Sequence, residues 1–196
     1  MRIARTGFIL LLTGFVVSCS ASNGQGADQP ASDAAPATEE VSGSTGFNVD
    51  AFLESPFADE TIGMPPLSPD EIDEAVAWFS TPPRLSESDV PNQYDPTVTD
   101  REVQITSDGI VLYYYYASSK EDYYLQLMRI DGGPELRFGI KVGMSTEELV
   151  AVCGTPDFRS EHEGDDVVFY LGDSSFNVGF ALVDGTVTAV YLSYMV

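Results

Sequence analysis

Apolar positions recur at helical spacing in two stretches of the chain, and each stretch carries signals for its start and its stop. The second is the clearer one, because Ser145 and Glu148 have the spacing of a capping box. Gly154 and Pro156 then mark the end of the helix. Its apolar face consists of Leu149, Val152 and Cys153, with Met144 before the cap.

The first stretch uses the same signals. Ser68 is expected to cap a helix that has Pro69 at its first position and Glu71 at its third. The apolar face of this helix would be Ile72, Ala75, Val76 and Phe79. A shorter helix is expected earlier in the chain, with Asn48 as its cap and Leu53 near its end.

Alternation of apolar and polar positions predicts three strands after each of the two main helices. The predicted strands cover residues 102–106, 110–117, 123–130, 167–171, 176–183 and 186–195. Asp108-Gly109 and Asp184-Gly185 have the composition of hairpin turns. The polar segment 84–100 is expected to be a long surface loop, and 136–141 a short strand.

The order of these elements predicts an α+β fold made of tandem helix-plus-antiparallel-sheet (αβββ) units. Ser68 and Ser145 would be equivalent caps in the two units. The first unit is expected to cover residues 47–133 and the second 134–196. Each unit is small for an independent core, so the two are expected to share one.

The first 18 residues have the layout of a secretory signal peptide. Arg2 and Arg5 precede an uncharged apolar run that is too short to span a bilayer comfortably. The run ends at Val16-Val17-Ser18-Cys19, which resembles the lipobox of bacterial lipoproteins. The resemblance implies cleavage before Cys19 and attachment of a diacylglyceryl group to its sulfur. An ordinary signal peptide is the alternative.

The segment after the cysteine is expected to be a disordered tether. Residues 19–46 contain only one large apolar side chain, Val41, and therefore bury too little surface to offset the entropy of ordering. A flexible chain of this length spans about 30 Å. The expected location is the cell envelope, at the periplasmic face of the outer membrane if the organism has one, because Ser20 follows the lipidated cysteine.

The run GIKVGMSTEELVAVCGTPD, at residues 139–157, is followed by an aromatic strand and a hairpin through Asp184-Gly185. This combination resembles the SmpA/OmlA (BamE-like) lipoprotein domain. The β-lactamase-inhibitor-protein type of fold, also built from helix-and-sheet units, is similar. The resemblance covers residues 139–196 and implies a non-enzymatic envelope module that binds other proteins.

The charge of the chain excludes some classes of partner. Its 31 Asp and Glu against 9 Lys and Arg give a net charge of −22, which becomes more negative when Arg2 and Arg5 leave with the signal peptide. Nucleic acid is therefore not an expected partner, since binding it requires basic patches. The expected partners are the membrane, through the lipid anchor, and an envelope protein whose identity the sequence does not specify.

No combination of residues predicts catalysis, a cofactor or a metal. The only histidine, His162, lies among acidic residues in an expected loop, and Cys153 on a helix face is expected to be buried and unreactive. An envelope or cell-wall hydrolase that uses paired carboxylates is the alternative function. The adjacent carboxylates of the chain include Glu39/Glu40, Glu147/Glu148 and Asp165/Asp166.

The most unusual local feature is a run of tyrosines. In a strand Tyr113 and Tyr115 face one side, while Tyr114 and Tyr116 face the other. One alternating pair is expected to remain largely exposed, because other parts of the chain can cover only one face. The binding site for a partner is therefore predicted among Tyr113, Tyr114, Tyr115, Tyr116, Tyr123 and Tyr124. Cross-strand packing of the rings is the alternative.

Overall fold

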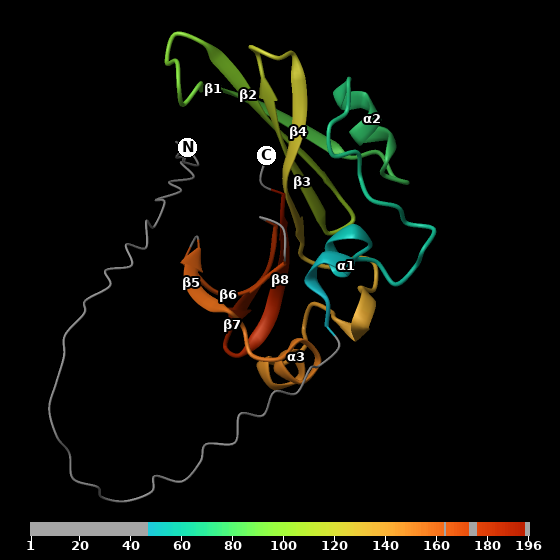
Figure 1. Cartoon of the computed structure of the whole chain (residues 1–196). Coiled ribbons are helices and arrows are strands. Elements are labelled where there is room, and N and C mark those ends of the chain that lie inside the picture. Colours follow the sequence, from blue (N-terminus) through green and yellow to red (C-terminus); the bar gives the residue numbers. More distant parts are fainter. Residues whose placement is uncertain (1–46, 163, 173–175, 195–196) are drawn as a thin grey trace, which may run out of the picture. The chain divides into compact units, whose positions relative to one another are not determined.

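The computed structural model describes residues 47–162, 164–172 and 176–194, and its strands form one antiparallel sheet (Figure 1). The strand order is β1-β2-β3-β4-β8-β7-β6-β5. Neighbours along the chain pair with each other from β1 to β4 and from β5 to β8. The two groups join where Leu127–Ile130 of β4 pairs with Val190–Ser193 of β8.

The first four strands are β1 (Arg84–Pro91), β2 (Thr99–Ser107), β3 (Ile110–Ala117) and β4 (Asp122–Ile130). The other four are β5 (Phe158–His162), β6 (Asp165–Leu171), β7 (Asn177–Val183) and β8 (Thr186–Ser193). The helices are α1 (Val49–Glu54), α2 (Ile72–Ala77) and α3 (Thr146–Cys153), with a single 3-10 turn, η1 (Arg137–Gly139).

The predicted α+β fold of tandem αβββ units is wrong. The protein is 16% helical and 44% strand, and it is mostly an eight-stranded antiparallel sheet with few helices. The prediction failed because it lacked β1 and β5, which form the two edges of the sheet. The sheet also continues across the expected boundary between residues 133 and 134, since β4 pairs with β8.

Both edge strands are polar and therefore gave no alternating pattern. Residues 84–100, predicted to be a loop, begin with β1, whose eight residues all pair with β2 although almost every side chain is exposed. His162, also predicted in a loop, is the last residue of β5. An edge strand that carries charges and a proline resists pairing with another chain, which accounts for the composition of β1.

The predicted ends of α1 and α3 are confirmed. The Asn48 side chain accepts a hydrogen bond from the backbone N–H of Ala51 at 2.8 Å and so caps α1. At α3 the Glu148 N–H donates to Ser145 Oγ at 3.2 Å, and the Ser145 N–H donates to Glu148 Oε2 at 2.8 Å. These two bonds form the capping box, and Leu149 is buried as expected.

The predicted start of the first main helix is wrong. Helix α2 begins at Ile72 with Glu71 at the N-cap, and no side chain caps it. The preceding segment is held on the sheet instead, because the Leu67 carbonyl accepts from Leu125 N at 2.8 Å and the Pro66 carbonyl from Tyr114 Oη at 2.7 Å. Residues 136–141 also form no strand, since only Leu136 makes an isolated bridge, with Phe57.

The main core lies between the sheet and the three helices. Side chains from α1, α2 and α3 pack with alternate residues of β2, β3, β4, β6, β7 and β8 in one cluster. We call this side of the sheet the helix face and the opposite side the open face. In Figure 1 the three helices lie along one side of the sheet. On the open face a smaller cluster forms among the side chains of the sheet itself: Val167, Ala181, Ala189 and Tyr191, with Leu127 and Phe169 packed against them.

Candidate binding face

The six tyrosines predicted as a binding site divide between the two faces of the sheet. Strand β3 alternates regularly, and its pairing with β4 sets Tyr116 opposite Tyr123 and Tyr115 opposite Tyr124. The structure therefore does not bring the six together. The helix face receives Tyr114, Tyr116 and Tyr123. The open face receives Tyr113, Tyr115 and Tyr124.

The three tyrosines on the helix face are structural. Tyr114 is 1% exposed, and its hydroxyl donates to the Pro66 carbonyl oxygen. The Tyr116 and Tyr123 rings lie with their centroids 4.7 Å apart, and the Arg101 guanidinium lies 4.7 Å from the centre of the Tyr116 ring. These contacts join β2, β3 and β4 to one another, so the cross-strand packing considered from the sequence applies to this set.

The tyrosines on the open face are half-buried, and none of the four at positions 113–116 is fully exposed. This differs from the expectation of a largely exposed pair. The reason is the register of the sheet: Tyr113 lies between Gln104 and Leu127. Such neighbours shield the ring edges and leave the remaining ring surface accessible.

The open face continues across β4 and β8 as an apolar cluster in which Tyr191 is buried and Leu127 is half-buried. Tyr191 on β8 lies beside Arg129 on β4, whose guanidinium is 5.8 Å from the ring centre. Arg129 also pairs with Asp131, with 2.6 Å between its Nε and Oδ1. The charged end of Arg129 is therefore held in place over the ring, and Leu127 completes this part of the surface.

Two stacked phenylalanines complete the surface near the β5 edge. The Phe158 and Phe169 rings are 4.6 Å apart and nearly parallel, at 8°. A side chain at Gly179, the cross-strand neighbour of Phe169, would place its Cβ 2.9 Å from that ring. Glycine at this position thus lets the ring lie close to β7. Phe158 remains 44% exposed and offers an aromatic surface at the end of the cluster.

A polar strip on β2 borders the tyrosines of the open face. Its first member, Asp100, is 0% exposed and accepts hydrogen bonds from Asn92 Nδ2 at 2.7 Å, from Ser118 N at 2.9 Å and from the Tyr115 hydroxyl. These bonds, led by that of Tyr115, lower the pKa of Asp100. Burial and the bond to Asp100 raise the pKa of Tyr115 to about 12. The network fixes the β1–β2 loop, the β3–β4 turn and the Tyr115 ring relative to one another.

The next two members of the strip are Glu102 and Gln104, both half-buried. Glu102 is the cross-strand neighbour of Tyr115, and Gln104 of Tyr113. Burial raises the pKa of Glu102. The sequence did not single out either residue, because only the register between β2 and β3 shows that they lie beside the tyrosines.

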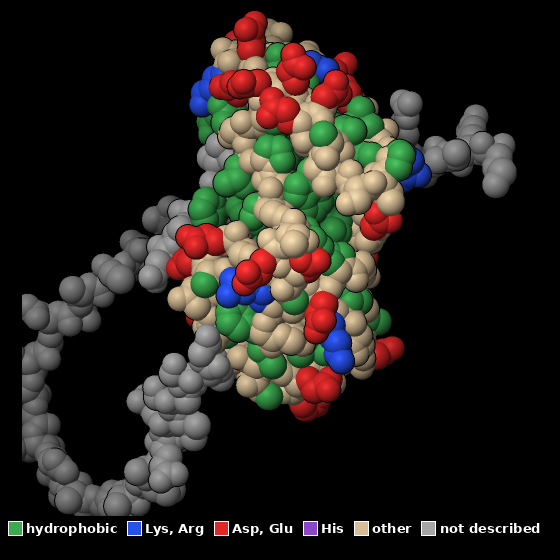
Figure 2. Space-filling model, turned by 90° about the vertical axis from the view of Figure 1, so that its right-hand side faces the viewer, with side chains coloured by type: hydrophobic (Ala, Val, Ile, Leu, Met, Phe, Trp, Pro, Cys, Tyr) green, Lys and Arg blue, Asp and Glu red, His purple; other side chains and the backbone are tan. Residues whose placement is uncertain are grey.

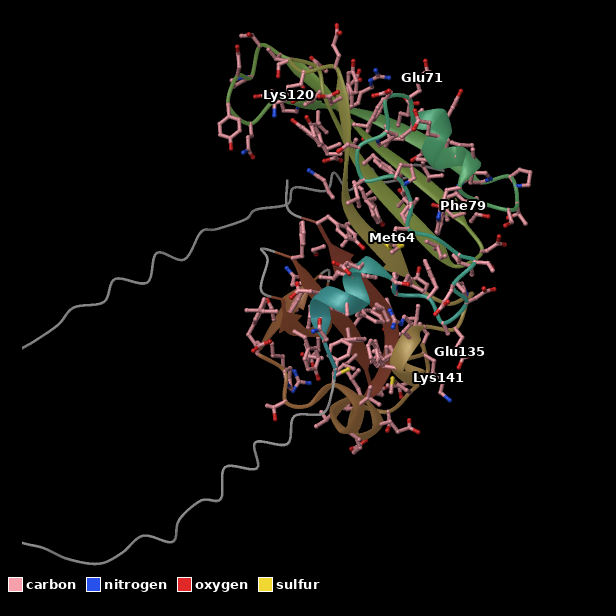
Figure 3. The ribbon with its side chains drawn as sticks, turned by 45° about the vertical axis from the view of Figure 1, so that its right-hand side comes forward. Met64, Glu71, Phe79, Lys120, Glu135 and Lys141 are labelled. Carbon is pink, nitrogen blue, oxygen red and sulfur yellow. The ribbon has the colours of Figure 1, made fainter. Side chains whose placement is uncertain are left out.

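A separate concavity lies on the helix face beside the first turn of α2. It encloses about 330 Å³ and is lined by Asp70, Glu71, Ile72, Asp73, Arg101, Tyr116, Glu121 and Tyr123. Figure 2 shows acidic side chains gathered at this end of the described part of the chain, with hydrophobic side chains over its middle. Figure 3 shows Glu71 and Lys120 at this end and Glu135 and Lys141 toward the other.

The carboxylate pairs considered from the sequence do not meet at this pocket. Glu148 is engaged in the cap of α3, and Asp166 forms a bidentate ion pair with Arg159. Glu39/Glu40 and Cys19 lie outside the described residues. No group of three or more His, Cys, Asp or Glu side chains within the described ranges is placed to hold a metal ion.

Cys153 is a free thiol on the buried face of α3, as predicted, and burial raises its pKa to about 12. A thiol with such a pKa is protonated at neutral pH and is a poor nucleophile.

No family model, curated protein or solved structure matches the chain. Within the part of the chain that the structure describes, no helix is both long and apolar enough to cross a membrane.

Proposed function

We propose that the chain is a lipid-anchored, non-enzymatic protein of the cell envelope that binds another protein through the open face of its sheet. The observation that carries this proposal is the band of aromatic and aliphatic side chains on the side of the sheet opposite the helices. Its accessible members are the half-buried tyrosines of β3 and β4 at one end and Phe158, which is 44% exposed, at the other, while the cluster of small and aromatic side chains between them is closed to solvent. Accessible aromatic side chains are typical of protein-interaction sites.

The chemistry of the face supports a protein partner with a basic surface. Tyrosine offers apolar area and a hydroxyl together, as interfaces require, and most rings here are held by neighbouring strands before any partner binds. The chain carries a net charge of −22, which attracts positively charged partners and repels anionic ones. A basic envelope protein is the occupant that both properties favour.

Binding is favoured over catalysis by the state of the chain's reactive groups. Cys153 is buried, and one carboxylate of each sequence pair is engaged, Glu148 in a helix cap and Asp166 in an ion pair with Arg159. The hydrolase alternative would have to use the acidic pocket beside α2, in which Arg101 is paired with Glu87 at 3.2 Å. The lining of that pocket contains carboxylates, one arginine and two tyrosines, and neither a histidine nor a cysteine.

The anchor is part of the same proposal and rests on the sequence Val16-Val17-Ser18-Cys19. A diacylglyceryl group on Cys19 would hold the protein at the membrane, and the polar segment 20–46 would let the sheet reach a partner. The proposed location is the outer membrane, at its periplasmic face, where the organism has one.

Site-specific photo-crosslinking in cells that express the full chain tests the binding face. A benzophenone side chain at Phe158 or Tyr124 would report on the open face, and one at Glu135 or Val150 would serve as an exposed control elsewhere. We expect one discrete protein adduct from both open-face positions and none from the controls. Adducts from the control positions alone, or none from the open face, would refute the proposed surface.

A further inference from the structure

We propose that the open face takes an arginine side chain of the protein partner between β2 and β3, with Glu102 as its anion and Tyr113 and Tyr115 as its aromatic surface. The inference rests on the proposed function, because it specifies the chemistry of the partner that the same face binds. It is based on the acceptors and rings that the register of these two strands brings together.

Glu102 is a carboxylate whose partial burial is not compensated inside the protein. It lies in the second strand of the sheet, between Ser88 on β1 and Tyr115 on β3. It forms no hydrogen bond or ion pair with any described residue, and burial raises its pKa. A half-buried carboxylate without an ion-pair partner has lost part of its hydration, which is unfavourable. A cationic donor from another molecule would replace that lost hydration.

The neighbouring group on β2 adds a second acceptor. The Gln104 amide donates one N–H from Nε2 to Thr106 Oγ1 at 3.4 Å, so its carbonyl oxygen and its second N–H are available to a ligand. Asp100 already accepts three hydrogen bonds and is closed to solvent. A ligand that bonds both the Glu102 carboxylate and the Gln104 carbonyl oxygen must therefore supply several donors.

The aromatic side of the site selects a flat cation. Tyr115 lies directly across from Glu102, and Tyr113 across from Gln104. A guanidinium group is planar, carries five N–H donors and stacks on aromatic rings, so one group can satisfy both acceptors and cover a ring. An ammonium group is a point charge with a strong hydration shell, so it can bond the acceptors but does not stack on a ring. Arginine fits this pattern better than lysine.

The helix face of the same three strands shows this arrangement filled from within the chain. There Arg101 pairs with Glu87 on β1 at 3.2 Å and lies 4.7 Å over the ring of Tyr116 on β3. On the open face the adjacent positions are Glu102 and Tyr115. Lys120 Nζ lies 5.6 Å from the ring centre of Tyr124, the cross-strand neighbour of Tyr115, and Arg129 lies near Tyr113, while Glu102 itself has no ion pair with a described residue. Arg84 on β1 lies opposite Thr106, farther along the strand.

The test uses small probes on the full chain without its lipid: acetyl-arginine amide, acetyl-lysine amide and acetyl-citrulline amide. Citrulline is the neutral isostere of arginine and removes the charge alone. We expect saturable NMR shifts at Glu102, Tyr113 and Tyr115 with arginine, weaker binding of lysine, and about tenfold weaker binding of citrulline. Equal binding of arginine and citrulline, or shifts located at the acidic pocket beside α2, would overturn the inference.

The matched variants are Glu102→Gln and Glu135→Gln, which remove one carboxylate each without changing its size. Glu135 lies in the loop before η1, toward the far end of the molecule (Figure 3). We expect Glu102→Gln to weaken arginine binding about fivefold or more and Glu135→Gln to leave it unchanged. Unchanged binding by Glu102→Gln overturns the site. If the open-face crosslinks persist in that case, the proposed function stands and only the arginine inference fails.

Discussion

Replacing Asp100 by asparagine is expected to lower the free energy of unfolding by about 2–4 kcal/mol. The Asp100 carboxylate is closed to solvent and accepts hydrogen bonds from Asn92 Nδ2, Ser118 N and the Tyr115 hydroxyl. Asparagine keeps the shape but turns one oxygen into a donor that faces the Asn92 amide. Loss of one charge-assisted hydrogen bond costs about 1.5–3 kcal/mol, and one unsatisfied buried donor costs about 1–3 kcal/mol. Partial relaxation of the loop lowers their sum to the expected range.

Chemical denaturation with the variants Asp100→Asn, Tyr115→Phe and Asn92→Ala measures this effect. Tyr115→Phe removes one hydrogen bond to the carboxylate and should cost about 1.5–3 kcal/mol, so it measures that single bond of the network. The pair Asp100→Asn and Tyr115→Phe should be strongly non-additive, since both act on one hydrogen bond. A shift below about 0.5 kcal/mol for Asp100→Asn would show that the carboxylate does not hold the loop and the turn in solution.

The same carboxylate makes a pH dependence of known sign. Its hydrogen bonds, first that of Tyr115, lower the pKa of Asp100 from its ordinary value of 3.8. The folded state therefore binds this proton less readily than the unfolded state. The stability that results is fully present above the ordinary value and is lost as the pH falls through the lower folded pKa. Below about pH 4 the unfolding free energy of Asp100→Asn should accordingly fall less steeply with pH than that of the unchanged protein.

Three further variants test other parts of the structure. Leu149→Ala should destabilise by about 2–5 kcal/mol in denaturant, because its side chain is 0% exposed, whereas Ser145→Ala should cost about 1 kcal/mol through loss of the cap; equal small effects would contradict the helix assignment. Tyr114→Ser should cost about 3–5 kcal/mol and Tyr113→Ser clearly less, and a reversed order would contradict the assigned faces of β3. Cys19→Ala should abolish incorporation of labelled fatty acid and membrane retention, and a variant that still incorporates the label would contradict the anchor.

The interior of the sheet could be predicted because its strands are apolar at alternate or at most positions. The six strands predicted after the two main helices correspond to β2, β3, β4, β6, β7 and β8, and each of these has two strand neighbours. The two strands that were missed are the two that have one neighbour. A strand that is covered on both faces requires apolar residues, while an edge strand can be polar. The composition of β1, which begins Arg84-Leu85-Ser86-Glu87-Ser88-Asp89, therefore cannot be distinguished from that of a loop.

Local helix signals succeeded at Ser145 and failed at Ser68, although hydrogen bonds hold both segments on the sheet. At α3 the Val187 N–H donates to the Met144 carbonyl and the Thr146 N–H to the Gly185 carbonyl, both at 2.9 Å, and these bonds leave the capping box of Ser145 intact. At Ser68 the Tyr114 hydroxyl donates to the Pro66 carbonyl and the Leu125 N–H to the Leu67 carbonyl, and Leu67 remains 49% exposed instead of packing on the helix. A capping pattern states what a segment prefers alone, and the start of a six-residue helix also depends on where the sheet holds the preceding residues.

The sequence predicted the tyrosines of the candidate site but not the residues that lie beside them. Four consecutive tyrosines show that both faces of β3 are aromatic, and alternation correctly separates Tyr113 and Tyr115 from Tyr114 and Tyr116. The partners of these rings are Glu102 and Gln104 on β2 and Leu127 on β4, set by a register that includes a shift between Tyr113 and Tyr114. A register error of one residue would exchange Glu102 for Arg101 beside Tyr115 and turn an acceptor site into a basic one. The chemistry that the face offers a partner therefore follows from strand pairing, which local residue patterns do not encode.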